Sequence, residues 1–281
     1  MKNQSFYQSI LQNSILVIKV SGKICDNEGS IDNVISDIKE LLNSISKLKV
    51  VLVFGFGRQL DNYMINVHGI EPKKINGRRV TSPTDIEAAK KISGQILIDI
   101  FSLSSRYNIR NFPIPISKKD FIAAKRRDVV DDIDHGQVGD VVSVDALQIK
   151  NLFKEHDMII MPSLVLDKNT SEVLNVNADT IATELAINLS ASKLIFISDV
   201  PYIKDLEGKR ISSVDENVAK LFEKNIISDG MVVKVDNSLK ALNKGVQKIH
   251  IISGEIKNAL ITELETEEGI GTVFQKNELE Y

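Results

Sequence analysis

The sequence is short of the residues on which several classes of protein depend. Its 281 residues include one cysteine, Cys25, and no tryptophan. A single cysteine excludes an internal disulfide, and no cysteine–histidine cluster has zinc-ligand spacing, so we expect a protein of the reducing cytoplasm without a structural metal. No apolar run approaches the roughly 20 residues that cross a bilayer, and residues 1–12 lack the pattern of a signal peptide. We therefore expect no membrane partner.

An excess of either charge is also missing. The chain carries 35 lysines and arginines against 38 aspartates and glutamates, a net charge of -3. Such a balance gives no field that would gather nucleic acid or anionic lipid. With 43% hydrophobic residues, a chain of this length can bury a large core. The composition favours a globular protein that acts on a small molecule.

Buried-strand patterns and amphipathic patterns alternate along the chain. Residues 14–20 form a β-branched run that ends at a Ser-Gly turn, a helical pattern over 31–48 follows, and a second apolar run at 50–54 leads into another glycine turn. Further strands are predicted at 158–166, 194–198 and 248–252, and further helices at 59–67, 84–107, 178–189, 216–224 and 232–242. This alternation predicts an α/β fold, an αβα sandwich with a mostly parallel central sheet.

One segment departs from the alternation. Residues 122–130 and 138–144 are two extended pieces around a polar turn, which predicts a hairpin on the rim of the sheet. No linker, repeat or low-complexity segment divides the chain. We therefore expect a single domain over 1–281 whose halves act as two lobes.

Ligands of such sheets bind beyond the carboxyl ends of the strands, where glycine turns let backbone N–H groups reach an anion. Three turns have this position: 19–22, 55–57 and 199–201. Each is weak as a single signal, because glycine follows strands wherever a turn needs a positive φ.

Two lysines and a polar cluster add to this picture. Lys19 ends an apolar strand and Lys234 lies among apolar residues near a helix start, so each either reaches water or holds a charged partner such as a phosphate. In the segment 175–179, Asn177 and Asp179 are good helix N-cap residues. The alternative is that Asn175 binds a substrate while Asp179 organises the two lysines.

Taken together, the order and spacing of these pieces resemble N-acetylglutamate kinases within the amino acid kinase family, over essentially the whole chain. The matching segments are VIKVSG at 17–22, NGRRVT at 76–81, VGDVVSV at 138–144, LNVNAD at 174–179, ISDV at 197–200, GMVVKV at 230–235 and EGIGT at 268–272. The resemblance implies the amino acid kinase fold, with a substrate lobe over about 1–170, an ATP lobe over about 171–281 and at least a homodimer.

The resemblance also implies roles for individual residues. Lys19 and Lys234 would stabilise the transferred phosphoryl group, with Asp179 holding both lysines. Arg79 would pair with the substrate α-carboxylate, beside Asn175. The remaining implied contacts are Gly55 and Phe56 for the substrate and Gly22, Gly57, Ser198, Asp199 and Gly230 for ATP. The cofactors would be ATP and Mg²⁺, with no metal ligand from the protein, and the product an acyl phosphate made for arginine biosynthesis.

The second glycine turn differs from the family pattern of histidine and three glycines. Here the residues are Phe54, Gly55, Phe56 and Gly57, followed by Arg58. If position 56 needed a positive φ, phenylalanine would strain the backbone by roughly 1–3 kcal/mol. The ring then either tucks aside, or reshapes the pocket so that Arg58 binds another anion, or blocks catalysis. The alternatives to acetylglutamate are thus another N-acyl amino acid as substrate, or a non-catalytic regulatory paralogue.

Two further segments resemble the arginine-feedback region of some family members. They contain His250 and Glu263, which we interpret as a core histidine and a surface glutamate. Residues 1–13 precede the first predicted strand, so we expect the N-terminal helix of arginine-sensitive members to be short or missing.

Overall fold

The computed structural model describes residues 4–75, 78–117, 121–205, 207–215 and 229–276. Eight strands form one central sheet: Ile15–Val20 (β1), Lys49–Phe54 (β2), Asn111–Pro113 (β5), Met158–Pro162 (β8), Lys193–Ser198 (β11), Ser213–Val214 (β14), Lys248–Ser253 (β15) and Thr272–Gln275 (β16). Their order is β14-β16-β15-β11-β1-β2-β8-β5. Neighbours are parallel except β15 and β16, which confirms the predicted mostly parallel sheet.

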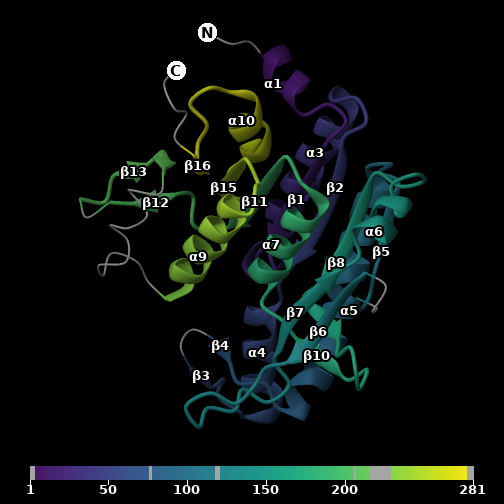
Figure 1. Cartoon of the computed structure of the whole chain (residues 1–281), viewed down its shortest axis with the longest axis vertical. Coiled ribbons are helices and arrows are strands. Elements are labelled where there is room, and N and C mark those ends of the chain that lie inside the picture. The colour runs from purple at the N-terminus through teal and green to yellow at the C-terminus, as the bar shows by residue number, and fades with distance from the viewer. Residues whose placement is uncertain (1–3, 76–77, 118–120, 206, 216–228, 277–281) are drawn as a thin grey trace.

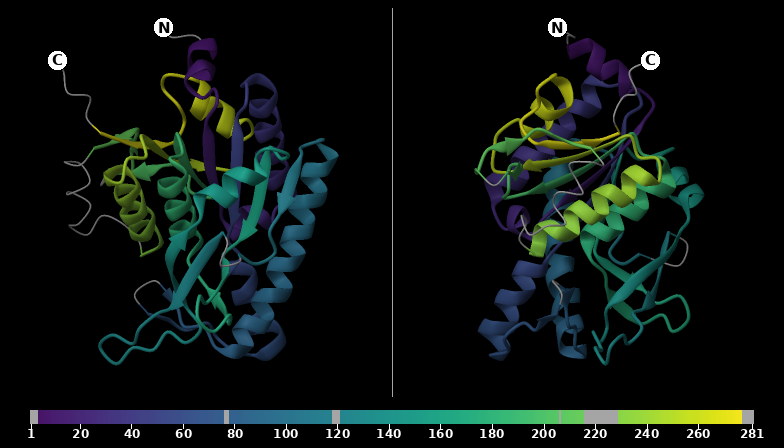
Figure 2. Two further views of the ribbon diagram at one scale, coloured as in Figure 1. Left: turned by 45° about the vertical axis from the view of Figure 1, so that its right-hand side comes forward. Right: turned by 60° about the vertical axis from the view of Figure 1, so that its left-hand side comes forward.

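Helices cover both faces of this sheet (Figure 1). They are Gln4–Ile10 (α1), Gly22–Cys25 (α2), Glu28–Ser44 (α3), Gly57–His68 (α4), Pro83–Arg106 (α5), Ala146–Leu152 (α6), Ala178–Leu189 (α7), Asp229–Asn243 (α9) and Ala259–Glu265 (α10). One core lies under α3, α5 and α10, and the other lies under α7 and α9. Figure 2 shows the sheet between these two layers from further directions. The helix predicted at 216–224 lies outside the described residues.

Side-chain alternation along the strands supplies both cores. In β1, Leu16 and Ile18 point into the first core while Val17 points into the second. A strand buried on both faces reads as an unbroken apolar run, which is why these strands were visible in the sequence. The long helix α5 begins as the Ser-Pro signal predicts, because Ser82 and Asp85 form a capping box around Pro83.

Four two-stranded ribbons accompany the sheet. They are Lys74–Ile75 (β3) with Arg78–Arg79 (β4), Ile122–Arg126 (β6) with Gly139–Val144 (β7), Leu164–Leu166 (β9) with Val173–Asn175 (β10), and Ile203–Lys204 (β12) with Arg210–Ile211 (β13). The β6–β7 pair confirms the predicted hairpin. The prediction of a single strand over 158–166 is wrong. The chain leaves the central sheet after Pro162 and then forms β9, which pairs with β10. Proline has no N–H with which to extend the ladder.

The topology gathers the ends of three neighbouring strands. Val20 at the end of β1 lies opposite Phe54 in β2 and Ile197 in β11. The turns that follow these strands therefore meet at one edge, as the rule for doubly wound sheets predicts. The β3–β4 ribbon lies toward the end of the molecule opposite the N- and C-termini (Figure 1). None of the helices in the described ranges is long and apolar enough to span a membrane.

Candidate active site

A cavity of about 550 Å³ opens at the edge where these strands end. Ten of the predicted site residues line it: Lys19, Gly22, Gly55, Phe56, Gly57, Arg79, Asn175, Asp179, Asp199 and Lys234. Of the other two, Ser198 is buried at the end of β11, where its Oγ accepts a hydrogen bond from the Val200 N–H at 3.3 Å, and Gly230 lies in the first turn of α9. The structure thus brings together residues that are up to about two hundred positions apart in the chain.

Two lysines share one carboxylate on the floor of this cavity. Lys19 Nζ lies 2.7 Å from Asp179 Oδ1, and Lys234 Nζ lies 3.7 Å from Asp179 Oδ2. The three residues come from β1, α9 and the first turn of α7. Two ammonium groups and one carboxylate leave one positive charge, aimed at the cavity.

Burial and charge set the protonation of this group. Burial raises the pKa of Asp179, but the charges of Lys19 and Lys234 outweigh it, so its pKa lies below the usual range. Burial lowers the pKa of Lys234, which Asp179 partly restores. The N-cap interpretation of the neighbouring cluster holds for Asn177, whose side chain accepts from the Thr180 N–H at 3.0 Å. Asp179 is therefore not the N-cap of α7, and its carboxylate can pair with both lysines.

The first two glycine turns press against each other. Gly22 begins α2, and a Cβ at this position would collide with the Gln59 side chain and lie 3.2 Å from the Gly55 carbonyl oxygen. Gln59 Nε2 donates to the Gly22 carbonyl oxygen at 2.7 Å and fixes this approach. Backbone N–H groups at the starts of α2 and α4 are thereby presented to the cavity, which suits polyphosphate.

Phe56 does not strain its turn. Its φ is -137°, so the left-handed conformation in which phenylalanine would be costly is not used. The ring is 2% exposed and packs into the core under α3 and α5. Of the outcomes expected for this position, the structure matches the one in which the ring tucks aside. Arg58 is half-exposed, with its Nε 4.0 Å from Asp26 Oδ2.

The lining of the cavity also includes the predicted substrate residues. Arg79 donates from Nη1 to Asp85 Oδ1 at 3.0 Å, and its Nη2 pairs with Asp61. Asn175 donates from Nδ2 to Thr81 Oγ1 at 3.2 Å. Both side chains are thus fixed before any ligand arrives.

Several residues of the cavity were missed in the sequence. Lys23 binds Asp199 Oδ2 at 2.9 Å, and Asp61 joins Lys74 at 3.0 Å as well as Arg79. Arg78 also lines the cavity. These are charged residues next to predicted site residues, so the available signal was their position beside the motifs.

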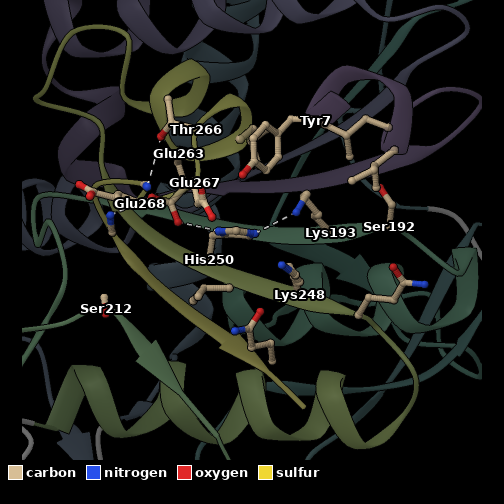
Figure 3. A pocket seen from close by; sticks show the side chains of 18 of the residues that line it. Tyr7, Ser192, Lys193, Ser212, Lys248, His250, Glu263, Thr266, Glu267 and Glu268 are labelled. Atoms are coloured by element: carbon tan, nitrogen blue, oxygen red, sulfur yellow. Dashed lines mark hydrogen bonds and ion pairs between the residues drawn. The ribbon is translucent and has the colours of Figure 1, made fainter. Parts of the chain in front are cut away.

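A second cavity, of about 470 Å³, lies between α1, the first residues of β11 and β15, and α10. Figure 3 shows His250 between Glu263 and Lys193. Its Nδ1 lies 2.6 Å from Glu263 Oε1, and its Nε2 lies 3.3 Å from Lys193 Nζ. Burial lowers the pKa of His250 to about 4 and that of Lys193 to about 8. A neutral ring that donates to Glu263 and accepts from Lys193 fits these contacts.

His250 is a core histidine, as predicted, but the prediction of a surface glutamate is wrong. Glu263 is 7% exposed, and its Oε2 accepts from the N–H groups of Ile270 and Gly271 at 2.7 and 2.8 Å. Gly269 has a φ of 54°, and a Cβ there would collide with this carboxylate. Three hydrogen-bond partners, His250 and the two backbone N–H groups, therefore compensate the burial of this carboxylate.

The N-terminal helix α1 is short, as expected, and it closes one side of the second cavity. Gln8 Nε2 donates to Glu265 Oε1 at 2.9 Å, and Gln4 contacts the other oxygen of the same carboxylate. Tyr7 of α1 lines the cavity (Figure 3). A helix of seven residues gains its stability from such contacts, since it is too short to persist alone.

The first cavity presents hydrogen-bond donors and positive charge to an anion. Within the described ranges, no group of three or more His, Cys, Asp or Glu residues could hold a metal ion. The helix starts at Gly22 and Gly57 and the two lysines instead suit phosphate oxygens.

Known proteins resemble this chain over most of its length. A sequence profile described as the amino acid kinase family matches residues 14–253. The acetylglutamate kinase of Hydrogenobaculum sp. (strain Y04AAS1) is 35% identical over 264 residues, which cover 92% of this chain and 90% of that protein. The acetylglutamate kinase of Aquifex aeolicus (strain VF5) is 33% identical over 273 residues, with the same coverage.

Solved structures share the fold. N-acetylglutamate synthase from Neisseria gonorrhoeae, complexed with coenzyme A and N-acetyl-glutamate, has a TM-score of 0.89 at 20% identity; the match covers 99% of this chain and 63% of the synthase chain. An isopentenyl phosphate kinase has a TM-score of 0.63 at 16% identity, covering 92% of this chain and 99% of that one. Together with the sequence relatives, these findings show that the chain belongs to the amino acid kinase family, in the branch of the acetylglutamate kinases.

Proposed function

We propose that the chain transfers the γ-phosphoryl group of ATP to the side-chain carboxylate of N-acetyl-L-glutamate, giving an acyl phosphate for arginine biosynthesis. The single observation that carries the proposal is the Lys19–Asp179–Lys234 group in the cavity. The sequence relatives at 35% and 33% identity support the choice of acceptor.

The two lysines match the charge that moves during transfer. In phosphoryl transfer, negative charge spreads over the three equatorial oxygens of the γ-phosphoryl group. Asp179 pairs with Lys19 through one carboxylate oxygen and with Lys234 through the other. The two ammonium groups are thus already positioned for the γ-phosphoryl oxygens and need no reorganisation. The N–H groups at Gly22 and Gly57 would bind the other phosphates. Mg²⁺ would arrive with the nucleotide and neutralise its β- and γ-oxygens.

The acceptor needs no general base. A glutamate side chain has a pKa of about 4.3, so it is already ionised at neutral pH and one of its oxygens can attack the γ-phosphorus directly. The bond from the γ-phosphorus to the bridging oxygen breaks, and ADP leaves with those electrons. The remaining requirement is alignment, which Arg79 and Asn175 would supply by holding the α-carboxylate end of the substrate.

The test of this proposal is ATP consumption by the purified protein with Mg²⁺ and N-acetyl-L-glutamate, with hydroxylamine added to trap the acyl phosphate. Hydroxamate formation supports the proposal. A panel of other N-acyl amino acids runs in parallel, because Phe56 lines the cavity where the family has glycine. Turnover on another member alone would indicate a different acyl substrate. ATP binding without transfer to any carboxylate would indicate a non-catalytic paralogue.

We also propose a division of the chain into two ligand-binding lobes and a cellular compartment for the protein. Residues of about 1–170 would form the lobe that binds the acyl amino acid, through Arg79, and residues of about 171–281 the lobe that binds ATP, through Lys234, while Lys19 and Asn175 reach the shared cavity from the other lobe in each case. We also propose that the protein acts in the cytoplasm.

We also propose a homodimer built at the β5 edge of the sheet. β5 is the last strand of the sheet, and the adjacent helix α5 exposes Ile98 (62%) and Phe101 (41%). The double variant Ile98→Glu/Phe101→Glu should be monomeric in light scattering while the wild-type protein is dimeric. Leu147→Glu, on the exposed face of α6, is the matched control and should leave the mass unchanged. A double variant that remained dimeric would show that the interface does not lie at the β5 edge.

A second proposal concerns control by L-arginine at the second cavity. His250 and Glu263 lie in the segments that resemble the arginine-feedback region, and the lining of the cavity carries both signs of charge, with Lys193 and Lys248 as cations and Glu267 and Glu268 as carboxylates. An amino acid with a cationic side chain and a free carboxylate complements such a site.

The pKa of Lys193 gives this proposal a pH dependence. Burial lowers that pKa to about 8, so the lysine is charged below pH 8 and neutral above it. If Lys193 binds the carboxylate of arginine, inhibition should be strongest near pH 7 and weaken as the pH rises through 8. Initial rates with and without L-arginine between pH 6.5 and 9 measure this. In Lys193→Met, the loss of inhibition between pH 7 and 9 should disappear. If this pH dependence persisted in the variant, it would arise from the titration of another group.

A further inference from the structure

Two arginines of β4 line the active-site cavity, and they differ in what they contact. The Arg79 side chain is 8% exposed and its guanidinium pairs with both Asp61 and Asp85. Asp61 also pairs with Lys74 at 3.0 Å. Two cations and two carboxylates cancel, so this group carries no net charge. An anion that binds Arg79 must compete with carboxylates already in place.

Of these two arginines, Arg78 is the one whose guanidinium has no carboxylate partner among the described residues. Its side chain is half-buried in the same cavity, and the guanidinium makes no hydrogen bond or ion pair with the residues that the structure describes. Arg127 and Asp140 act on it electrostatically, and they are paired with each other. Burial and then the Arg127 charge lower the pKa of Arg78, while Asp140 raises it. Two cations and one carboxylate leave one positive charge on this side.

The two arginines line the same cavity but have different charged neighbours. Arg79 pairs with aspartates of α4 and α5, whereas Arg78 lies within electrostatic reach of Asp140 in β7. A half-buried cation without a partner is costly to keep unless a ligand supplies the missing charge.

We propose that Arg78 supplies the unpaired positive charge that binds the α-carboxylate of the N-acyl amino acid, beside Arg79. The inference rests on the proposed function and adds a specificity residue to it. The cavity then offers two separate groups with a net positive charge: Lys19 and Lys234 with Asp179 for the phosphoryl transfer, and Arg78 for the α-carboxylate. Arg79, held by Asp61 and Asp85, acts as a rigid second donor.

The experiment compares N-acetyl-L-glutamate with its α-amide, which lacks only the charge that Arg78 is proposed to bind. A charge-assisted hydrogen bond at such a site corresponds to about a 10- to 100-fold effect on binding. Arg78→Leu should raise KM for N-acetyl-L-glutamate by about that factor, with little change in kcat, and should leave KM for the α-amide unchanged. Arg78→Lys should recover part of the loss. Arg110→Leu, at an exposed arginine paired with Asp157, is the control.

Titration calorimetry of the same two ligands gives a readout that needs no turnover. Wild-type protein that prefers the acid to the amide, and loses this preference in Arg78→Leu, supports the inference even if no hydroxamate forms and the proposed function fails. Wild-type protein that makes hydroxamate while Arg78→Leu retains the full preference overturns the inference alone. Equal losses on both ligands, or a wild-type protein that binds neither, also overturn it.

Discussion

Replacing Lys234 by methionine should lower kcat by about 10²- to 10³-fold, the loss seen when one preorganised donor to a developing charge is removed. Methionine keeps the length of the stem and removes the ammonium group, so the loss would report charge more than packing. The fold should be little affected, because Asp179 keeps Lys19 at 2.7 Å as its partner. Steady-state rates with saturating ATP and N-acetyl-L-glutamate measure the effect.

Lys240→Met is the matched control for this prediction. Lys240 lies on the same helix, α9, but its half-exposed ammonium group pairs with Glu184 away from the cavity. Surface ion pairs contribute little, so this variant should keep wild-type turnover. A Lys234→Met protein that also kept full turnover would remove Lys234 from the mechanism.

Most of the fold could be predicted because its strands are buried on both faces. Runs such as Val50 to Phe54 carry no alternation to confuse with a surface strand, and the glycines that follow them mark where each strand ends. The order of strands in the sheet was not available from such local patterns. It depends on which strand packs beside which, and that depends on contacts between distant residues.

The site was predictable where a residue type conflicts with its surroundings. Lys19 in an apolar strand and Asp179 beside a helix start are charges that need partners, and the structure pairs them. Phe56 was harder, because the sign of φ follows from the turn and not from the residue. Glu263 was misread for a related reason: glutamate is seldom buried, and here backbone N–H groups of a loop and one histidine compensate for it.

The ion pairs of Arg79 also could not be predicted from the local sequence. Its segment marked it as a substrate residue, but nothing in the local sequence indicates that Asp61 reaches it from α4. Asp85 serves twice, as the N3 residue of the α5 capping box and as a partner of Arg79. Whether an arginine is free or already paired is a property of the packed structure, and it decides which of two neighbouring arginines can attract an anion.

Asp179→Asn should damage both catalysis and stability, unlike the change at Lys234. The amide cannot balance two ammonium groups, so Lys19 and Lys234 are left buried and facing each other. Removing one partner of a buried charge group costs about 3–5 kcal/mol of unfolding free energy. Turnover should fall by at least about 10²-fold, since the lysines either separate or lose a proton. Denaturant unfolding and steady-state rates measure the two effects, and Glu184→Gln on the same helix is the control.

The pH dependence of this variant separates a charge effect from a packing effect. Because the pKa of Asp179 is lowered in the folded protein, its carboxylate stabilises the fold above the unfolded-state pKa of about 3.9, and this stability is lost as the pH falls through the lower folded value. The stability deficit of Asp179→Asn relative to the wild-type protein should thus be full at pH 7 and shrink below pH 4. A deficit that stays constant down to pH 2 would point to lost packing and would leave the two lysines without Asp179 as their organiser.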